Sequence, residues 1–301
     1  MTMPVPPGRR HGRIVRHYGV EVRLAFDDGD FLTVRVKRNS GHVVGDRVCW
    51  HGDRLERLER RTLLQRQDPF GKVRSLAANL DGLGIVLAPQ PTTPVAFIER
   101  VLVAARSAAI APFLLVNKAD LAGSAVLAQQ LRQQFGDTQP LLLVSALSGA
   151  GLTPLRDLLA TLGCCALAGQ SGVGKSALLN ALCPGLDLQV GELAEGGQGG
   201  HTSSVSTLVD LASGGSLIDT PGFRDFAPVQ IASAELPGWF PGFAELLRQG
   251  ACRFRDCRHR QEPGCVIRQA LADGSLSAER YGRYLALLDE LEAAEQRQRG
   301  W

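Results

Sequence analysis

A glycine-rich stretch in the second half of the chain has the residue types and the spacing that hold a phosphate group. It reads Gly169-Gln170-Ser171-Gly172-Val173-Gly174-Lys175-Ser176. Glycines let the loop aim its N–H groups at a phosphate, while Lys175 is expected to reach the β- and γ-phosphates and Ser176 to bind Mg²⁺. Apolar runs at 164–168 and 177–182 predict the strand and helix that must flank such a loop. The alternative is a chance glycine-rich turn, which these flanking elements disfavour.

A second motif, Asn117-Lys118-Ala119-Asp120, directly follows a predicted strand at 112–116. The Asp120 carboxylate suits the N1–H and 2-amino donors of guanine, and adenine would leave it unpaired. Asn117 is expected to fix the loop and the base edge, and the Lys118 stem to cover the base face. Ser145-Ala146 follows the next predicted strand, where the Ala146 N–H is expected to reach guanine O6. These motifs together predict a guanine nucleotide site.

The order of the two motifs is the reverse of that in an ordinary GTPase, because the guanine motif precedes the phosphate loop by about 50 residues. Strands that alternate with helices predict an α/β domain with a parallel sheet and ligand loops at the strand carboxyl ends. Both motifs build one site if the domain is circularly permuted. A predicted helix at 152–162 then leads directly to the phosphate-loop strand. Domain termini lie close together often enough for such a rearrangement.

Two further magnesium ligands are expected after the phosphate-loop helix, one in a glycine-rich segment and one at the end of the strand predicted at 216–218. The glycine-rich segment 191–204 stands where a first switch belongs, and the hydroxyl of Thr202 is expected to complete the Mg²⁺ shell, with Ser203 and Ser204 as alternatives. Asp219 is expected to bind Mg²⁺ through water, and the Gly222 N–H to contact the γ-phosphate.

Phe223 stands where many GTPases keep a glutamine that orients water, so intrinsic hydrolysis is expected to be slow. His201 is the candidate for the missing group, and an exposed loop histidine is the alternative.

Four candidate metal ligands lie within 14 residues near the C-terminus: Cys252, Cys257, His259 and Cys265. Three thiols and one imidazole suit tetrahedral Zn²⁺ with no open position, hence a structural site. Reduced cysteines in a small helical domain are the alternative. Five arginines surround the cluster and are expected to face RNA phosphates: Arg248, Arg253, Arg255, Arg258 and Arg260.

The N-terminal segment is predicted to be a small closed barrel of the OB type. Alternating apolar residues on both sides of the turn 27–30 predict a hairpin, and further short strands are expected at 14–15, 43–44 and 48–50. Residues 1–75 carry 16 Lys and Arg against 9 Asp and Glu, whereas residues 76–232 carry 7 against 11. The basic excess favours RNA binding over a barrel used only for packing.

Whole-chain properties fit a globular protein. Hydrophobic residues make up 45% and charged residues 21% of the 301 residues. No apolar run approaches the ~18 residues of a membrane span, and the N-terminus lacks the apolar core of a signal peptide. We therefore expect a cytoplasmic protein whose seven cysteines stay reduced or bind metal. The predicted divisions are a disordered tail (1–8), the barrel (9–66), the permuted domain (67–232) and a helical zinc-binding domain (233–301).

With these parts in this order, nearly the whole chain resembles the ribosome small-subunit-dependent GTPase A family of bacteria. The resemblance implies an OB barrel, a circularly permuted GTPase domain and a zinc-binding C-terminal domain. It implies guanine-binding roles for Asn117, Lys118 and Asp120, a phosphate loop from Gly169 through Ala177, and zinc ligation by the cluster. One departure is Thr202-Ser203-Ser204, where members commonly have three threonines after a histidine.

We therefore expect a monomeric GTPase that binds the small ribosomal subunit and its rRNA and acts in late subunit maturation. Subunit-stimulated hydrolysis of GTP to GDP and phosphate would drive its release. The alternatives are an RNA-binding module that senses nucleotide with negligible hydrolysis, an ATP-dependent enzyme such as a kinase, and a GTPase of the large subunit.

Overall fold

Five parallel strands form the centre of the computed structural model, which describes residues 8–67, 73–136, 138–184, 206–219 and 231–299. They are β8 (Gly82–Leu87), β9 (Ala111–Val116), β10 (Leu141–Leu143), β11 (Cys164–Ala168) and β13 (Ser216–Asp219). Their spatial order is β10-β9-β8-β11-β13. The chain thus winds outwards in both directions from β8 and β11, and the loops that leave this pair diverge at the carboxyl edge. Such a switch point is where open α/β sheets bind ligands.

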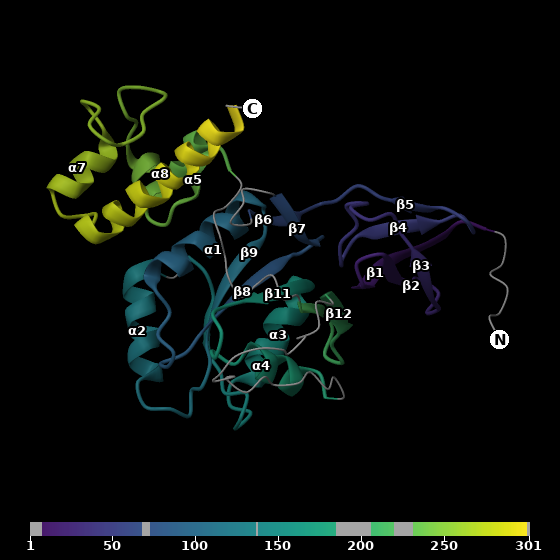
Figure 1. The fold of residues 1–301 in the computed structure, drawn as a ribbon. Coiled ribbons are helices and arrows are strands. Elements are labelled where there is room, and N and C mark those ends of the chain that lie inside the picture. The colour runs from purple at the N-terminus through teal and green to yellow at the C-terminus, as the bar shows by residue number, and fades with distance from the viewer. Residues whose placement is uncertain (1–7, 68–72, 137, 185–205, 220–230, 300–301) are drawn as a thin grey trace, which may run out of the picture.

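Helices cover both faces of this sheet (Figure 1). The helices α1 (Val95–Ser107) and α2 (Ser124–Phe135) pack on one face, together with Leu83 and Ile85 of β8. On the other face, α3 (Leu152–Leu162) and α4 (Lys175–Leu182) pack against Val86 and β11 residues. All six residues of β8 are buried, as expected for a strand covered on both faces. The predicted parallel α/β sheet is therefore confirmed.

The N-terminal strands form a curved, partly open barrel. It consists of β1 (Arg10–His17), β2 (Glu21–Phe26), β3 (Phe31–Arg35), β4 (Arg47–Trp50) and β5 (Leu55–Arg57). The predicted hairpin is confirmed, since the Phe26 N–H donates to the Asp30 carbonyl at 2.9 Å across the turn. The barrel was expected to be closed. Among the described strands, however, β3 pairs only with β2 and β5 only with β4, so backbone hydrogen bonds leave the barrel open.

One expected strand, at Val43–Val44, is wrong. Both residues are buried in a loop rather than in a strand. The fully buried Asp46 carboxylate accepts the Val43 N–H at 2.8 Å, and Gly45 has a φ of +89°. Side-chain capping and a left-handed residue hold this segment as a turn, so its two valines fill the core outside any strand. The Val44 carbonyl accepts the Ala78 N–H at 3.0 Å.

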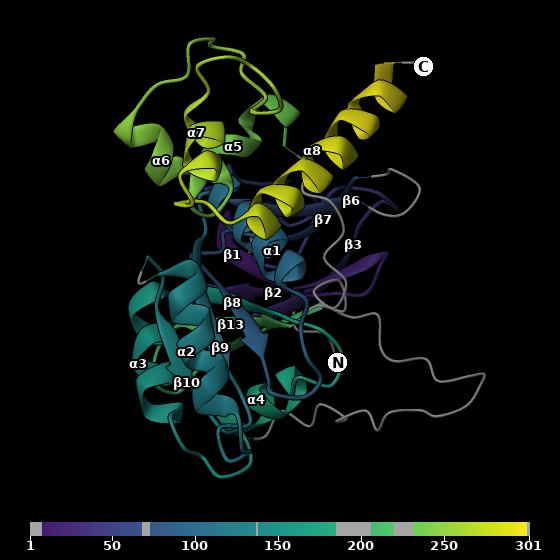
Figure 2. The same cartoon turned by 90° about the vertical axis from the view of Figure 1, so that its left-hand side faces the viewer.

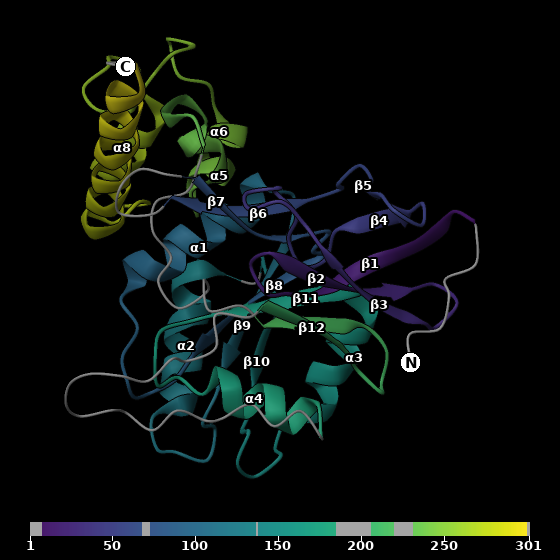
Figure 3. The same cartoon turned by 45° about the vertical axis from the view of Figure 1, so that its right-hand side comes forward.

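The barrel is continuous with the central sheet, which the sequence did not indicate. The strand β12 (Ser206–Asp210) pairs antiparallel with β13 on one side and with β1 on the other, opposing Arg16 to Thr207 and His17 to Ser206. The strand order β11-β13-β12-β1 therefore runs from the central sheet into the barrel, and Figure 3 shows β12 at the side of the sheet where the barrel strands lie. A separate two-stranded ribbon, β6 (Leu63–Gln67) with β7 (Val73–Ala78), leads from the barrel into β8.

The C-terminal region is helical. It contains a 3₁₀ turn (Ser233–Glu235), α5 (Leu236–Trp239), α6 (Phe243–Gln249), α7 (Val266–Ala272) and α8 (Ala278–Arg299). In Figure 2 these helices lie above α1 and α2. Ser277 caps the start of α8, because its hydroxyl accepts the Arg280 N–H at 3.3 Å. The helix continues through its polar end to Arg299, and the Glu295 carboxylate accepts the Ser233 N–H at 2.6 Å.

Ion pairs attach α8 to α1. Glu99 of α1 is 1% exposed and accepts Arg283 Nε at 2.6 Å and Nη2 at 3.0 Å. One helical position on, Arg100 donates to Glu290 at 2.7 Å. No helix in the described ranges combines the length and the apolar composition needed to cross a bilayer.

Candidate functional site

The three motifs expected to build one site meet at the carboxyl edge of the central sheet, and Asn117 connects them. Its side chain is 2% exposed. Nδ2 donates to the Val173 carbonyl in the phosphate loop at 2.9 Å, and Oδ1 accepts the Ala146 N–H at 3.2 Å. A single buried amide thus holds together loops that lie 56 and 29 residues away along the chain. This is the convergence that a circular permutation requires.

The phosphate loop depends on two close approaches. A Cβ at Gly174 would lie 2.3 Å from Asn117 Nδ2, and one at Gly169 would lie 2.5 Å from the Val86 carbonyl oxygen. Only glycine fits at these positions. The helix α4 begins at Lys175, whose Nζ donates to the carbonyls of Gly169 at 2.5 Å and Gln170 at 2.8 Å. The ammonium is therefore held against the loop backbone, at a helix N-terminus that favours anions.

A buried hydroxyl orients the Asp120 carboxylate. Ser145 is fully buried, and its Oγ donates to Asp120 Oδ1 at 2.5 Å while it accepts the Ser148 N–H at 3.1 Å. Asp120 itself is exposed. The sequence named Ser145 as a site residue without giving it this role.

One group expected to contact the base, the Ala146 N–H, has another partner in this structure. The Ala146 N–H, expected at guanine O6, donates to Asn117 Oδ1. The Ala119 N–H donates to the Val144 carbonyl at 3.0 Å, which fixes the motif to the neighbouring strand. Lys118 has a φ of +61°, and its Nζ donates to the Gln90 carbonyl at 2.7 Å.

The loop that follows β8 is a part of the site that sequence reasoning missed. Besides the Lys118 contact to Gln90, Pro91 lies beside the phosphate loop, because a Cβ at Gly172 would be 3.4 Å from its ring. The neighbourhood of β8 and β11 in the sheet brings this loop to the site, and no local pattern reveals that neighbourhood.

Of the expected magnesium ligands, Ser176 and Asp219 are described. Asp219 ends β13, which lies parallel and next to β11, so it shares an edge with the phosphate loop. Ser176 is the second residue of α4 and is half-buried. His201, Thr202 and Gly222, with Ser203, Ser204 and Phe223, lie outside the described residues.

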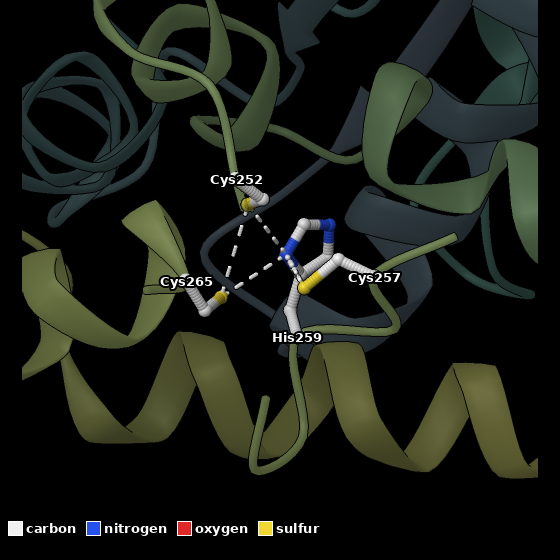
Figure 4. Close-up of side chains that lie close together, drawn as sticks. All are labelled: Cys252, Cys257, His259 and Cys265. Carbon is white, nitrogen blue, oxygen red and sulfur yellow. Dashed lines mark hydrogen bonds between the residues drawn. The ribbon is translucent and has the colours of Figure 1, made fainter. Parts of the chain in front are cut away.

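The C-terminal cluster brings its four predicted ligands together (Figure 4). His259 Nδ1 lies 3.3 Å from Cys265 Sγ, 3.5 Å from Cys257 Sγ and 3.6 Å from Cys252 Sγ. All four ligand atoms lie within 4.8 Å of one another. A tetrahedron of zinc–sulfur bonds has edges of about 3.8 Å, so the cluster fits a zinc site.

The chemistry of these donors agrees with their geometry. Burial raises the pKa of Cys257 to about 12 and lowers the pKa of His259. Burial thus favours a neutral imidazole, the form that binds metal, and makes a metal-free thiolate costly. Tyr281 fixes the loop by donating its hydroxyl to the His259 carbonyl at 2.6 Å. The remaining cysteines are free thiols, with Cys49, Cys165 and Cys183 buried and Cys164 half-buried.

The arginines around the cluster divide into two groups. Arg260 pairs with Asp289 at 2.5 Å and Glu292 at 2.8 Å, and Arg258 donates to Ser233 Oγ at 2.9 Å. Arg248, Arg253 and Arg255 are exposed, and Arg248 pairs with Glu245 of its own helix at 3.4 Å. The expectation that all five face RNA is therefore too broad, since Arg258 and Arg260 fasten the loop to its own domain.

Fold and site together define the class of protein: a circularly permuted GTPase with a phosphate loop. The sequence pattern of the RsgA GTPase family matches residues 57–228, which is more than half of the chain. The chain belongs to this family and is a GTP-hydrolysing enzyme. The family resemblance and the fold class predicted from the sequence are confirmed.

Similar proteins extend this match beyond the central domain. The small ribosomal subunit biogenesis GTPase RsgA of Azotobacter vinelandii is 40% identical over 301 aligned residues, covering 94% of this chain and 86% of that protein. The protein of the same name from Pseudomonas aeruginosa (strain LESB58) is 39% identical over 288 residues, covering 92% and 84%.

Two solved structures share the fold. YjeQ from Thermotoga maritima superposes with a TM-score of 0.71 at 27% identity, covering 94% of this chain and 99% of that one. YloQ, described as a circularly permuted GTPase, superposes with a TM-score of 0.68 at 25% identity, covering 95% and 96%.

Proposed function

We propose that this GTPase binds the small ribosomal subunit, acts in its late maturation, and is released when the bound subunit stimulates hydrolysis of GTP to GDP and phosphate. The observation that carries this proposal is the Asn117 side chain, which bonds to the phosphate loop and to the Ala146 loop at once. The names of relatives that are about 40% identical supply the subunit.

Each residue at the edge has a role in this proposal. Asp120, oriented by Ser145, selects guanine, and Lys118 covers the base. The backbone N–H groups of residues 169–177 and the Lys175 ammonium bind the phosphates. They also stabilise the negative charge that develops on the phosphate oxygens during hydrolysis. Ser176, Asp219 and Thr202 would hold Mg²⁺, which when bound neutralises phosphate charge. We assign Gly222 to sensing the γ-phosphate and His201 to orienting water.

The other parts serve recognition. We propose that Cys252, Cys257, His259 and Cys265 bind one structural Zn²⁺, and that the barrel (9–66) and the C-terminal domain (233–301) contact rRNA on either side of the GTPase domain (67–232). The basic excess of residues 1–75 supports the barrel contact. We further propose that the protein is a cytoplasmic monomer.

The test is a GTPase assay with purified ribosomal subunits. Small subunits should raise the hydrolysis rate well above that of the protein alone, while large subunits at the same concentration should not. An unchanged rate under multiple turnover, together with no hydrolysis in a single turnover at saturating small subunits, would leave only a nucleotide-sensing RNA-binding module. Sedimentation of the protein with a GTP analogue and a mixture of subunits gives the partner directly, and migration with the large subunit would refute the assignment.

A further inference from the structure

Three arginines converge on a hollow where the barrel meets the GTPase sheet. The hollow has a volume of about 300 Å³ and is lined by Arg13, Gly45, Arg47, Arg61, Asn79, Cys164 and Leu208. Its walls therefore come from the barrel, from the linker that precedes β6, and from β11 and β12 of the GTPase sheet. It lies at the β1–β12 pairing. It is separate from the carboxyl edge of the central sheet where the phosphate loop and the Asn117 loop meet, which we call the nucleotide edge.

Two of the arginines oppose one another directly. Arg13 of β1 and Arg47 of β4 are partners in the antiparallel register. Like charges at opposed positions of a sheet are unfavourable unless something of opposite charge lies between or beside them. Here carboxylates lie beside them: Asp210 accepts Arg13 Nη2 at 2.5 Å, and Asp27 accepts Arg47 Nη2 at 3.0 Å.

The third arginine repeats this arrangement. Arg61 Nη1 donates to Asp81 Oδ1 at 2.8 Å. Its backbone N–H donates to Asn79 Oδ1 at 2.9 Å, and Asn79 Nδ2 donates to the Gly45 carbonyl at 2.8 Å. This network fixes the rim of the hollow and the base of the Arg61 side chain.

The aspartates hold the arginines without occupying the hollow. Among the described residues that line it there is no carboxylate. A guanidinium carries five N–H donors, and one carboxylate uses only some of them. The side chains of Arg61 and Arg47 are 66% and 46% exposed, so donors of both remain accessible to a ligand. The arrangement is a set of pre-oriented cations that face one small space.

We propose that this hollow binds a phosphate group, and that Arg13, Arg47 and Arg61 form a phosphate clamp between the barrel and the GTPase sheet. Guanidinium forks match the oxygens of phosphate. If the proposed function is right, the phosphate belongs to the rRNA backbone. A clamp at the β1–β12 junction then ties RNA contact to both domains at once. A free phosphorylated molecule has the same chemistry and is separated by the experiment.

The test measures binding of purified small subunits to the full-length protein saturated with a GTP analogue, at several salt concentrations. Arg61→Gln and Arg13→Gln should each weaken binding about fivefold or more and reduce the slope of log K against log salt by about one. The matched control is Arg132→Gln on α2, which removes the same charge from an exposed position outside the hollow and should change binding less than about twofold.

Asp210→Asn separates phosphate binding from a structural role of the Arg13 pair. It breaks the pair but leaves the guanidinium, so it should retain or strengthen subunit binding. Weakening equal to that of Arg13→Gln would overturn the clamp. Thermal melting of each variant checks that the fold persists.

The source of the phosphate is tested by titrating inorganic pyrophosphate into protein saturated with GDP, so that the phosphate loop is filled. Binding that is lost in Arg61→Gln, with subunit affinity unchanged, supports the clamp with a free phosphorylated ligand. If neither ligand responds to Arg61→Gln and Arg13→Gln, the clamp is refuted. Failure of the unmutated protein to bind small subunits would refute the proposed function, and the pyrophosphate titration would still test the clamp.

Discussion

The C-terminal cluster and the nucleotide edge are both built from loops, but their parts come from very different distances along the chain. The four cluster residues span 14 positions, and their ligand atoms lie within 4.8 Å of one another. At the nucleotide edge, Asn117 bonds to a residue 56 positions away. The cluster is a local structure whose ligand atoms fit a metal ion, whereas the edge is a product of strand order. Substitutions in the cluster should therefore unfold the surrounding region, whereas substitutions at the edge should change nucleotide binding and leave the fold intact.

The largest effect should follow loss of the metal. Cys257→Ser removes one of four ligands, and because structural zinc contributes on the order of 10 kcal/mol to small domains, residues 233–301 should lose their ordered helices. The core between the central sheet and the helices α3 and α4 contains no residue of 233–301, so the sheet should remain folded. Zinc content by mass spectrometry, together with limited proteolysis, measures both. The control is Cys183→Ala, at a buried cysteine outside the cluster. This variant should keep its zinc, and its residues 233–301 should stay resistant to proteolysis.

Lower pH should weaken metal binding steeply. Burial raises the pKa of both Cys257 and Cys265, so both thiols are protonated near neutral pH without metal and must each release a proton to bind it. Because zinc binds all three cluster cysteines as thiolates, apparent zinc affinity should fall by at least about a hundredfold for each pH unit lost below neutrality. Competition with a chelator of known proton affinity from pH 8 to pH 6 measures this slope. A flat profile would mean that the thiols do not bind the metal.

At the nucleotide edge, Asp120→Asn should change specificity and leave the fold unchanged. The carboxamide presents a donor where guanine also presents donors, so GTP affinity should fall about a hundredfold. Xanthosine triphosphate, which carries an acceptor there, should bind instead. Equilibrium binding of labelled nucleotides gives both constants. Equal loss of both nucleotides would remove the base-reading role, and Asp157→Asn on exposed α3 surface serves as the charge control.

Asn117→Ala tests whether one amide holds the edge together. The Val173 carbonyl and the Ala146 N–H both lose their partner, which corresponds to about 2 kcal/mol, or about thirtyfold in GTP affinity. Zinc content should not change, in contrast to Cys257→Ser. Asn39→Ala, at an exposed barrel turn, should leave affinity unchanged. If Asn117→Ala binds GTP normally, the loops are positioned by the strands alone.

Local sequence determined several features of this protein independently of tertiary contacts with other elements. The strand, glycine loop and helix around Lys175 follow from residue spacing, since glycine conformation and helix capping act over a few residues. The hairpin at 27–30 and the Cys₃His cluster do so for the same reason. The reversed motif order, read with these parts, was enough to indicate a permuted GTPase.

Tertiary structure alone decided how these parts are joined. Strand order placed the Gln90–Pro91 loop beside the phosphate loop. It also brought the Ala146 N–H within hydrogen-bond distance of Asn117 Oδ1. It also fused the barrel to the central sheet through β12, and used Arg258 and Arg260 inside their own domain. Such contacts depend on which elements become neighbours, and neighbourhood is set by burial of the whole core rather than by any short pattern.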